Sequence, residues 1–255
     1  MKKLLVIGIG AGDPDYITLQ AVKALNQVDV FFILDKGSSK DKLIHLRREI
    51  CERYITGRDY RFVEAGSPER ERGGEYDAAV KDLNLAKQQV FERLIGEELG
   101  EGECGAFLVW GDPSLYDSTL RILQAILRGG RLAFEYEVIP GISSIQALAA
   151  RHKVPLNRIG RSIEITTGRR LAEGFPSNVD SVVVMLDAED TYTRLDAPDL
   201  YIYWGAYVGT PDEILIAGKL KDVAADIART RQQAREANGW IMDTYLLRRG
   251  DDEGV

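Results

Sequence analysis

Residues 3–14, KLLVIGIGAGDP, begin the chain with an apolar run that ends in a cluster of glycines. The run is short and closes at Gly8, which is typical of a buried β-strand followed by a tight turn. Gly10 and Gly12 follow at once, and glycines after a first parallel strand let the backbone turn sharply and come close to a ligand. The stretch therefore predicts the first strand of an α/β domain, followed by either a structural turn or a ligand-binding loop.

The glycine spacing does not match the loops that bind phosphate. A dinucleotide-binding G-x-G-x-x-G pattern would place glycine at position 13, where the chain has Asp13. A carboxylate at that position would repel a pyrophosphate. A Walker A loop would need Gly-Lys-Ser/Thr, which does not follow. If this loop binds a ligand, we therefore expect a ligand without phosphate.

Apolar runs of strand length alternate with segments of helical spacing up to Pro140. Such alternation is typical of a mostly parallel sheet covered by helices. A polar segment rich in glycine and arginine at 64–75 is expected to be a loop. The strands are expected at 3–9, 28–34, 105–110 and 133–139, and the helices at 18–27, 40–53, 76–99 and 117–128.

The second half of the chain has more strand-like runs and fewer helices, which predicts a mixed sheet. We therefore expect two α/β domains, an N-terminal one over 1–140 and a C-terminal one over 141–255. The strands are expected at 162–167, 181–186, 199–204, 214–218 and 240–247, and a helix is expected at 222–237.

The composition excludes several classes of protein. With 45% hydrophobic and 29% charged residues the chain reads as globular, and its net charge of −7 argues against nucleic acid as a partner. No apolar run approaches the roughly 20 residues of a membrane helix. Cys51 and Cys104 have neither zinc-ligand nor disulfide spacing, which predicts free thiols in a reducing cytoplasm and no metal site. His45 and His152 are expected to be structural.

Three motifs follow predicted strands in order. They are 8–14 (GIGAGDP), 111–116 (GDPSLY) and 140–144 (PGISS), the last followed by the alanine-rich segment 146–150. Together they make the chain resemble the tetrapyrrole (corrin/porphyrin) methylases, apart from Ala11, where the family has proline. The resemblance covers nearly the whole chain.

The resemblance implies a two-domain α/β C-methyltransferase of cobalamin biosynthesis with S-adenosylmethionine in the cleft between its domains. It further implies a precorrin macrocycle as substrate and a cytoplasmic homodimer. The acidic net charge and the lack of a long apolar run are the reasons to expect no nucleic-acid and no membrane partner. Segments 60–100, 207–220 and 239–249 resemble the family members that also release an acetyl group as acetate. The alternatives are a precorrin methylase without deacylation, a ribosomal RNA 2′-O-methyltransferase and a non-catalytic tetrapyrrole-binding protein.

The resemblance also assigns cofactor contacts, although most of these residues have a structural alternative. Asp112, Ser143 and Ser144 could equally be helix caps. Leu186 could be a core leucine, and Tyr207 could serve packing alone. The full set of expected cofactor residues is Ala11, Gly111, Asp112, Leu115, Ser143, Ser144, Leu186, Ala206 and Tyr207.

A macrocycle with several acetate and propionate groups needs cationic partners, for which Lys36, Arg169 and Arg170 are expected because each follows a predicted strand end. Tyr116 is expected either to line the floor under the macrocycle or to pack in the core. Loss of an acetyl group needs a general base, for which Asp35 is the candidate. The alternative for Asp35 is a carboxylate that caps the next turn.

Overall fold

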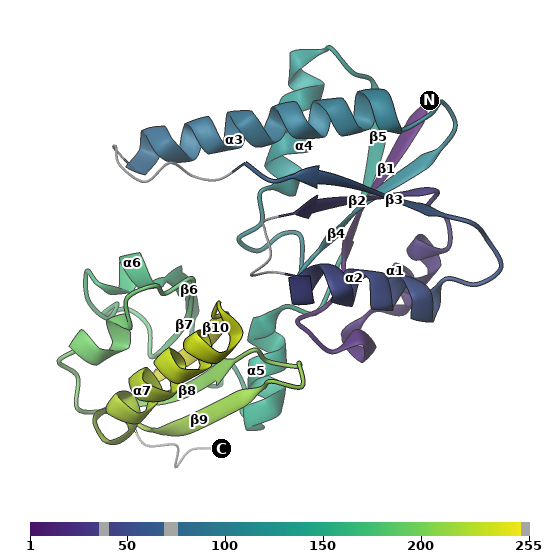
Figure 1. The fold of residues 1–255 in the computed structure, drawn as a ribbon. Helices are drawn as coiled ribbons and strands as arrows, with labels where there is room; N and C mark the ends of the chain where they lie inside the picture. The colour runs from purple at the N-terminus through teal and green to yellow at the C-terminus, as the bar shows by residue number, and fades with distance from the viewer. Residues whose placement is uncertain (36–40, 69–75, 251–255) are drawn as a thin grey trace. The chain divides into compact units, whose positions relative to one another are not determined.

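The computed structural model describes residues 1–35, 41–68 and 76–250, which form two compact units, Met1–Ser143 and Ser144–Val255. Each unit is built around one five-stranded sheet (Figure 1). The predicted mostly parallel sheet in the first half and mixed sheet in the second half are both confirmed.

The first sheet is parallel throughout and has the order β3-β2-β4-β1-β5. Its central strands β1 and β4 contain the buried runs 4–8 and 104–109, because both faces of the sheet are covered there. The prediction of a loop over 64–75 is wrong for residues 64–66, which belong to an edge strand over 61–66. The strands are β1 (Lys2–Gly8), β2 (Val30–Asp35), β3 (Arg61–Gly66), β4 (Cys104–Val109) and β5 (Phe134–Ile139).

Two hydrophobic cores lie on the two faces of this sheet. α1 (Leu19–Leu25) and α2 (Asp41–Tyr54) cover one face, and α3 (Tyr76–Arg93) and α4 (Thr119–Gly129) cover the other (Figure 1). The helix expected over 76–99 ends earlier as an α-helix and continues as a π-helical turn over Leu94–Glu98.

The second sheet is mixed and has the order β6-β7-β10-β8-β9. Only β6 and β7 are parallel, and the other pairs are antiparallel. This pattern agrees with the crowding of strand-like runs in the second half of the sequence. The strands are β6 (Ile163–Thr167), β7 (Ser181–Met185), β8 (Leu200–Ala206), β9 (Ile214–Lys219) and β10 (Asp243–Arg249).

One face of the second sheet packs against α7 (Leu220–Asn238), α6 (Gly168–Leu171) and the 3-10 turn η4 (Thr191–Arg194). The other face, on which Tyr203 lies, contacts α5 (Ser144–His152). Among the residues that the structure describes, we find no helix with the length and apolar character of a membrane span.

Candidate functional site

Three glycine-containing loops of the first unit pack backbone against backbone at the carboxyl ends of its strands. Gly10 and Gly111 form a bridge in which the Gly111 N–H donates to the Gly10 carbonyl at 2.8 Å and the Gly10 N–H donates back at 3.3 Å. A Cβ on Gly8 would lie 2.6 Å from the Gly141 nitrogen, so a side chain has no room there. The glycines of all three motifs are therefore needed for one tight junction.

Asp112 ties two of these loops together. Its Oδ1 accepts hydrogen bonds from the Ser114 N–H at 2.8 Å and from the Ser114 hydroxyl, while Oδ2 accepts from the Gly141 N–H at 2.8 Å. Burial raises the pKa of Asp112, but the hydrogen bonds from Ser114 and Gly141 outweigh burial and hold this pKa below its usual value. The cap alternative for Asp112 is wrong, because α4 begins after Ser118 and Asp117 accepts from the Thr119 N–H.

The loop after β4 adopts strained backbone angles. Gly111 has φ +70°, which favours glycine, and Tyr116 has φ +51°, which is uncommon for a residue with a side chain. Tyr116 is 43% exposed, so the alternative that it packs in the core is wrong. Leu115 is half-buried, and its N–H donates to the Asp112 carbonyl at 3.3 Å. Strain of this kind is concentrated at ligand-binding sites.

Two strand ends of the second unit show the same strain. Leu186 follows β7 with φ +55° and is 65% exposed, so the alternative that it is a core leucine is wrong. Tyr207 follows β8 with φ +49°, but its ring is buried and packs edge-on against Trp240. Ala206 is also buried. Any ligand contact at Tyr207 therefore falls to its backbone, whereas Leu186 offers an apolar side chain.

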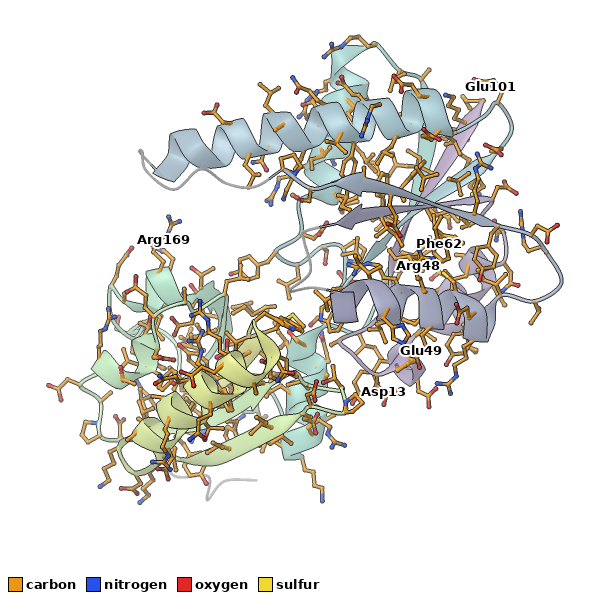
Figure 2. All side chains as sticks on the ribbon, in the orientation of Figure 1. Asp13, Arg48, Glu49, Phe62, Glu101 and Arg169 are labelled. Carbon is orange, nitrogen blue, oxygen red and sulfur yellow. The ribbon has the colours of Figure 1, made fainter. Side chains whose placement is uncertain are left out.

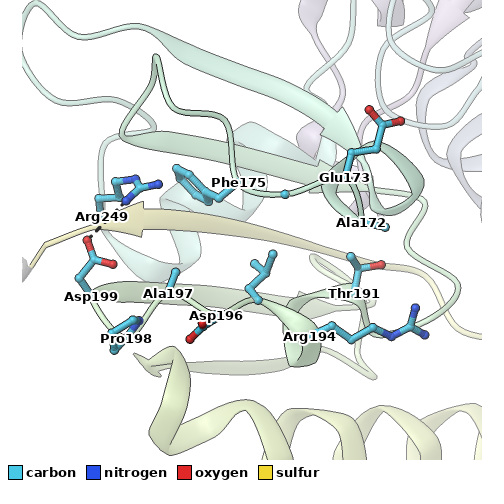
Figure 3. A pocket seen from close by; sticks show the side chains of 12 residues that line it. Ala172, Glu173, Phe175, Thr191, Arg194, Asp196, Ala197, Pro198, Asp199 and Arg249 are labelled. Carbon is cyan, nitrogen blue, oxygen red and sulfur yellow. Dashed lines mark ion pairs between the residues drawn. The ribbon is translucent and has the colours of Figure 1, made fainter.

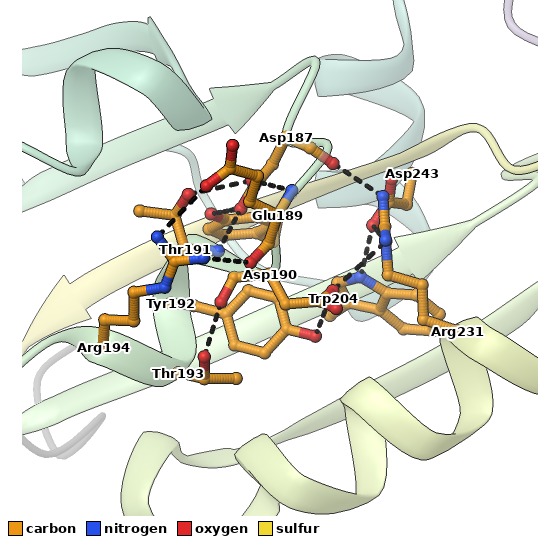
Figure 4. A network of polar contacts seen from close by, with 11 residues as sticks. Asp187, Glu189, Asp190, Thr191, Tyr192, Thr193, Arg194, Trp204, Arg231 and Asp243 are labelled. Carbon is orange, nitrogen blue, oxygen red and sulfur yellow. Dashed lines mark hydrogen bonds and ion pairs between the residues drawn. The ribbon is translucent and has the colours of Figure 1, made fainter.

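A buried polar network surrounds Asp187, the residue that follows Leu186 in the sequence (Figure 4). The Asp187 carboxylate accepts from the Thr191 N–H at 2.8 Å and from the Tyr245 hydroxyl at 2.6 Å. Arg231 donates to the Asp187 carbonyl at 2.6 Å and to Asp243 Oδ2 at 2.9 Å. Burial lowers the pKa of Arg231, but the ion pair with Asp243 outweighs burial and raises it. The strained turn therefore rests on a rigid base.

The remaining expected cofactor residues are buried or close to a helix start. Ser143 is buried directly before α5, which begins at Ser144, so Ser143 occupies the position of an N-cap. Ala11 is buried between two glycines with positive φ, Gly10 and Gly12. The burial of Ser143 and Ala11 fits a structural role, so a contact with the cofactor could be made only through their backbone.

The expected substrate residues are placed unequally. Arg169 and Arg170 lie exposed on α6, after the end of β6. Figure 2 shows Arg169 there. Arg170 pairs with Glu173 at 2.7 Å, so part of its charge is already neutralised. Asp35 ends β2, but its side chain and the whole of Lys36 lie outside the described residues.

A pocket of about 610 Å³ in the second unit contains none of the expected site residues (Figure 3). It is lined by Phe175, Asp199 and Arg249 among others, with Arg249 stacked over the Phe175 ring. Asp199 precedes the start of β8, whereas Ala206 ends that strand. The lining also includes Thr191, whose N–H donates to Asp187 next to Leu186, so the pocket extends from the start of β8 toward the end of β7.

The described residues contain no group of three or more His, Cys, Asp or Glu that could hold a metal ion. His152 contacts the Trp204 carbonyl at 3.0 Å, and burial lowers the pKa of its ring. His45 is exposed on α2, and both cysteines are buried and free. Burial raises the pKa of Cys51 to about 12, which makes a reactive thiolate unfavourable.

Comparison with known proteins agrees with this architecture. Residues 3–224 match the tetrapyrrole (corrin/porphyrin) methylases, and the chain belongs to this family. A precorrin-6A synthase (deacetylating) from Sinorhizobium sp. is 52% identical over 99% of this chain and 97% of that protein. A crystal structure of a cobalamin-synthesis-related protein from Corynebacterium diphtheriae is 37% identical, with a TM-score of 0.83 over 98% of this chain and all of that chain.

A more distant solved structure shares the fold alone. It is a uroporphyrin-III C-methyltransferase from Thermus thermophilus in complex with S-adenosylhomocysteine, 18% identical with a TM-score of 0.57 over 96% of this chain and 91% of that chain.

The sequence patterns did not indicate the residues of the buried polar network next to Leu186. Asp187, Arg231 and Asp243 are far apart in the sequence and read as ordinary surface charges. Arg231 sits on the apolar side of α7 between Ile227 and Ala234, all buried. An arginine in the apolar stripe of a helix is the one signal that pointed to a buried ion pair.

Proposed function

We propose that this chain is an S-adenosylmethionine-dependent C-methyltransferase of aerobic cobalamin biosynthesis that converts precorrin-5 to precorrin-6A. The reaction methylates C-1 of the macrocycle and releases an acetyl group as acetate. The observation that carries the proposal is the 52% identity over 99% of the chain to a precorrin-6A synthase (deacetylating).

The strand ends are suited to S-adenosylmethionine, which carries a sulfonium and no phosphate. Gly111 has no side chain to block the approach of a ligand, and its positive φ turns the loop sharply after β4. Leu186 offers an exposed apolar side chain on a rigid turn, which suits the flat apolar face of an adenine.

The bound cofactor supplies a methyl group on a sulfonium, and the macrocycle supplies an electron-rich carbon as nucleophile. The chain therefore needs no nucleophilic side chain, and its residues act by alignment and exclusion of water. Alignment of two reactants can lower a barrier by up to ~7–11 kcal/mol. The junction of Gly8, Gly111 and Gly141 and the network around Asp187 supply the rigidity that such alignment needs.

Release of acetate needs a water molecule that attacks the acetyl carbonyl carbon. The bond between that carbon and the macrocycle then breaks, and its electron pair returns to the ring. A general base must take the proton of the attacking water. We keep Asp35 as the candidate base because it ends β2 at the carboxyl edge of the first sheet.

The test is mass spectrometry of the products formed from a precorrin pool and cofactor labelled in the methyl group. We expect a product that has gained one labelled methyl group and lost one acetyl group. Gain of a methyl group alone would favour a methylase without deacylation. Macrocycle binding with no labelled product would favour a tetrapyrrole-binding protein.

We further propose that the chain acts as a cytoplasmic homodimer, as its resemblance to the tetrapyrrole methylases implies. Light scattering after size-exclusion chromatography is expected to give twice the 28.4 kDa of one chain. A measured mass equal to that of one chain would contradict the dimer, but it would not bear on the proposed reaction.

A further inference from the structure

Two neighbouring strands of the first sheet separate before they end. β2 and β4 pair from Val30–Gly105 to Phe32–Phe107, although β2 continues to Asp35 and β4 to Val109. The chain also leaves these strands in opposite directions, from β2 through α2 to β3 and from β4 through α4 to β5 beyond β1. Such a switch point is where open parallel sheets bind ligands, outside the carboxyl ends of the strands.

Arg47 of α2 places its guanidinium at this switch point. Its Nε donates to the Leu108 carbonyl at 3.1 Å, one residue beyond the last pair between β2 and β4. Its Nη1 donates to the Leu43 carbonyl at 2.8 Å. These two bonds fix the plane of the guanidinium, and Nη2 makes no hydrogen bond to the described residues. Donors of a rigid fork therefore remain available.

The charge of Arg47 has no neutralising partner among the described residues, since none of their carboxylates lies within ion-pair distance. Burial lowers the pKa of this guanidinium, and Asp117 opposes the shift from a longer distance. The Asp117 carboxylate already accepts from the Thr119 N–H at 2.7 Å at the start of α4. Arg47 is half-buried, and a partly desolvated cation without a counter-charge carries a cost that binding of an anion reduces.

A second unused donor follows the same strand. Trp110 comes directly after β4, and its indole Nε1–H is buried without a hydrogen-bond partner among the described residues. Leu108 packs in the core beneath α1 and α2. Side chains two residues apart on a strand point to the same face, so we expect Trp110, one residue past the end of β4, to lie on the same side as Leu108. The end of β4 thus offers two donor groups without acceptors among the described residues, Arg47 Nη2 and Trp110 Nε1, which suits an anionic ligand.

We propose that Arg47 forms a carboxylate-binding subsite between the ends of β2 and β4. Its ligand is an acetate or propionate side chain of the macrocyclic substrate, so this inference rests on the proposed function for the substrate class. A planar guanidinium matches a carboxylate with two parallel N–H donors. Arg170, expected from the sequence for this role, is instead exposed and paired with Glu173.

Arg48 provides a matched control on the same helix. It carries the same charge, but it pairs with Glu64 and stacks over the Phe62 ring with 4.4 Å to the centroid (Figure 2). R47M and R48M therefore change the net charge equally, while only R47M removes the cation at the switch point. Each variant is measured for binding of uroporphyrin I, a polycarboxylate macrocycle, by fluorescence at low and high salt. S-adenosylhomocysteine binding is measured by calorimetry.

We expect R47M to lose uroporphyrin affinity by about tenfold or more with a weaker salt dependence, because a charge-assisted pair is lost. R48M and the wild type are expected to bind alike, and S-adenosylhomocysteine affinity is expected to stay unchanged in all three. If R47M does not fold, R47K carries the test, since it keeps the charge and loses the fork. We expect R47K to bind uroporphyrin several-fold more weakly than the wild type.

The proposed subsite is overturned if R47M binds uroporphyrin with the affinity of the wild type. If R47M does not fold, it is overturned if R47K binds uroporphyrin with the affinity of the wild type. A wild type that does not bind uroporphyrin overturns it as well. The proposed function fails by a different result, namely the absence of labelled product in the mass-spectrometric assay. The two failures are therefore distinguishable.

Discussion

Replacement of Gly141 by alanine is expected to open the junction of the three glycine loops. A Cβ on Gly141 would lie 2.8 Å from the Gly8 carbonyl carbon and 2.9 Å from its Cα, and it would lie closer still to the Gly111 carbonyl oxygen. Favourable carbon–carbon contact begins near 3.5 Å, so the Gly8 and Gly141 loops must separate by at least about 0.6–0.7 Å, and the Gly111 carbonyl oxygen must move farther. Gly141 has no positive φ, so the perturbation is purely steric.

This displacement acts on the loop that is proposed to hold the cofactor. Overpacking of a rigid junction costs about 1–3 kcal/mol of stability. Misplacement of reacting groups by ~1 Å can cost on the order of 100-fold in rate, so we expect a loss of about tenfold to 100-fold in methyl transfer. We also expect a weaker S-adenosylhomocysteine complex, measured by calorimetry on the folded fraction.

Gly129 offers a matched control, because it also lacks a positive φ and a Cβ there would meet no atom within 4 Å. G129A lies at the end of α4 and is expected to leave cofactor affinity unchanged, with stability equal or higher by up to about 1 kcal/mol. A folded G141A variant with wild-type affinity and rate would refute the reasoning, because the junction would then have no influence on the cofactor loop.

Other perturbations test other parts of the molecule. R231M leaves the buried Asp243 carboxylate without its counter-charge and should cost about 3–5 kcal/mol in urea unfolding. A cost below ~1 kcal/mol would contradict the network. Hydrogen bonds from Arg61 lower the pKa of Glu103 to about 2. This pair therefore stabilises the fold above pH ~4.5, and its contribution is lost as the pH falls toward 2. E103Q should make the free energy of unfolding less dependent on pH in that window, and an unchanged pH dependence would argue against the pair. G111V should weaken S-adenosylhomocysteine binding because φ +70° disfavours valine, and wild-type affinity would remove this loop from the site. Methyl transfer should be insensitive to EDTA, and loss of activity restored by zinc or magnesium would show a metal requirement.

Local patterns in the sequence were enough to predict most of the fold. Apolar runs of strand length closed by glycine marked β1 and β4, because a strand buried on both faces needs an unbroken apolar stretch. The edge strand β3 escaped notice because it is covered less completely, and Arg61 and Glu64 interrupt its apolar pattern. Edge strands depend on pairing with a neighbour, here β2, which a local pattern does not reveal.

The candidate site divides in the same way. The sequence by itself determined the glycine loops, because close backbone contact and positive φ demand glycine at fixed positions. Only the tertiary structure decided that Leu186 and Tyr116 are exposed, since an apolar residue after a strand reads equally well as core. Arg47 reads as one of several charges on an amphipathic helix. Its contact with Leu108, 61 residues away, exists only because β2 and β4 separate at their ends and leave a carbonyl without a strand partner.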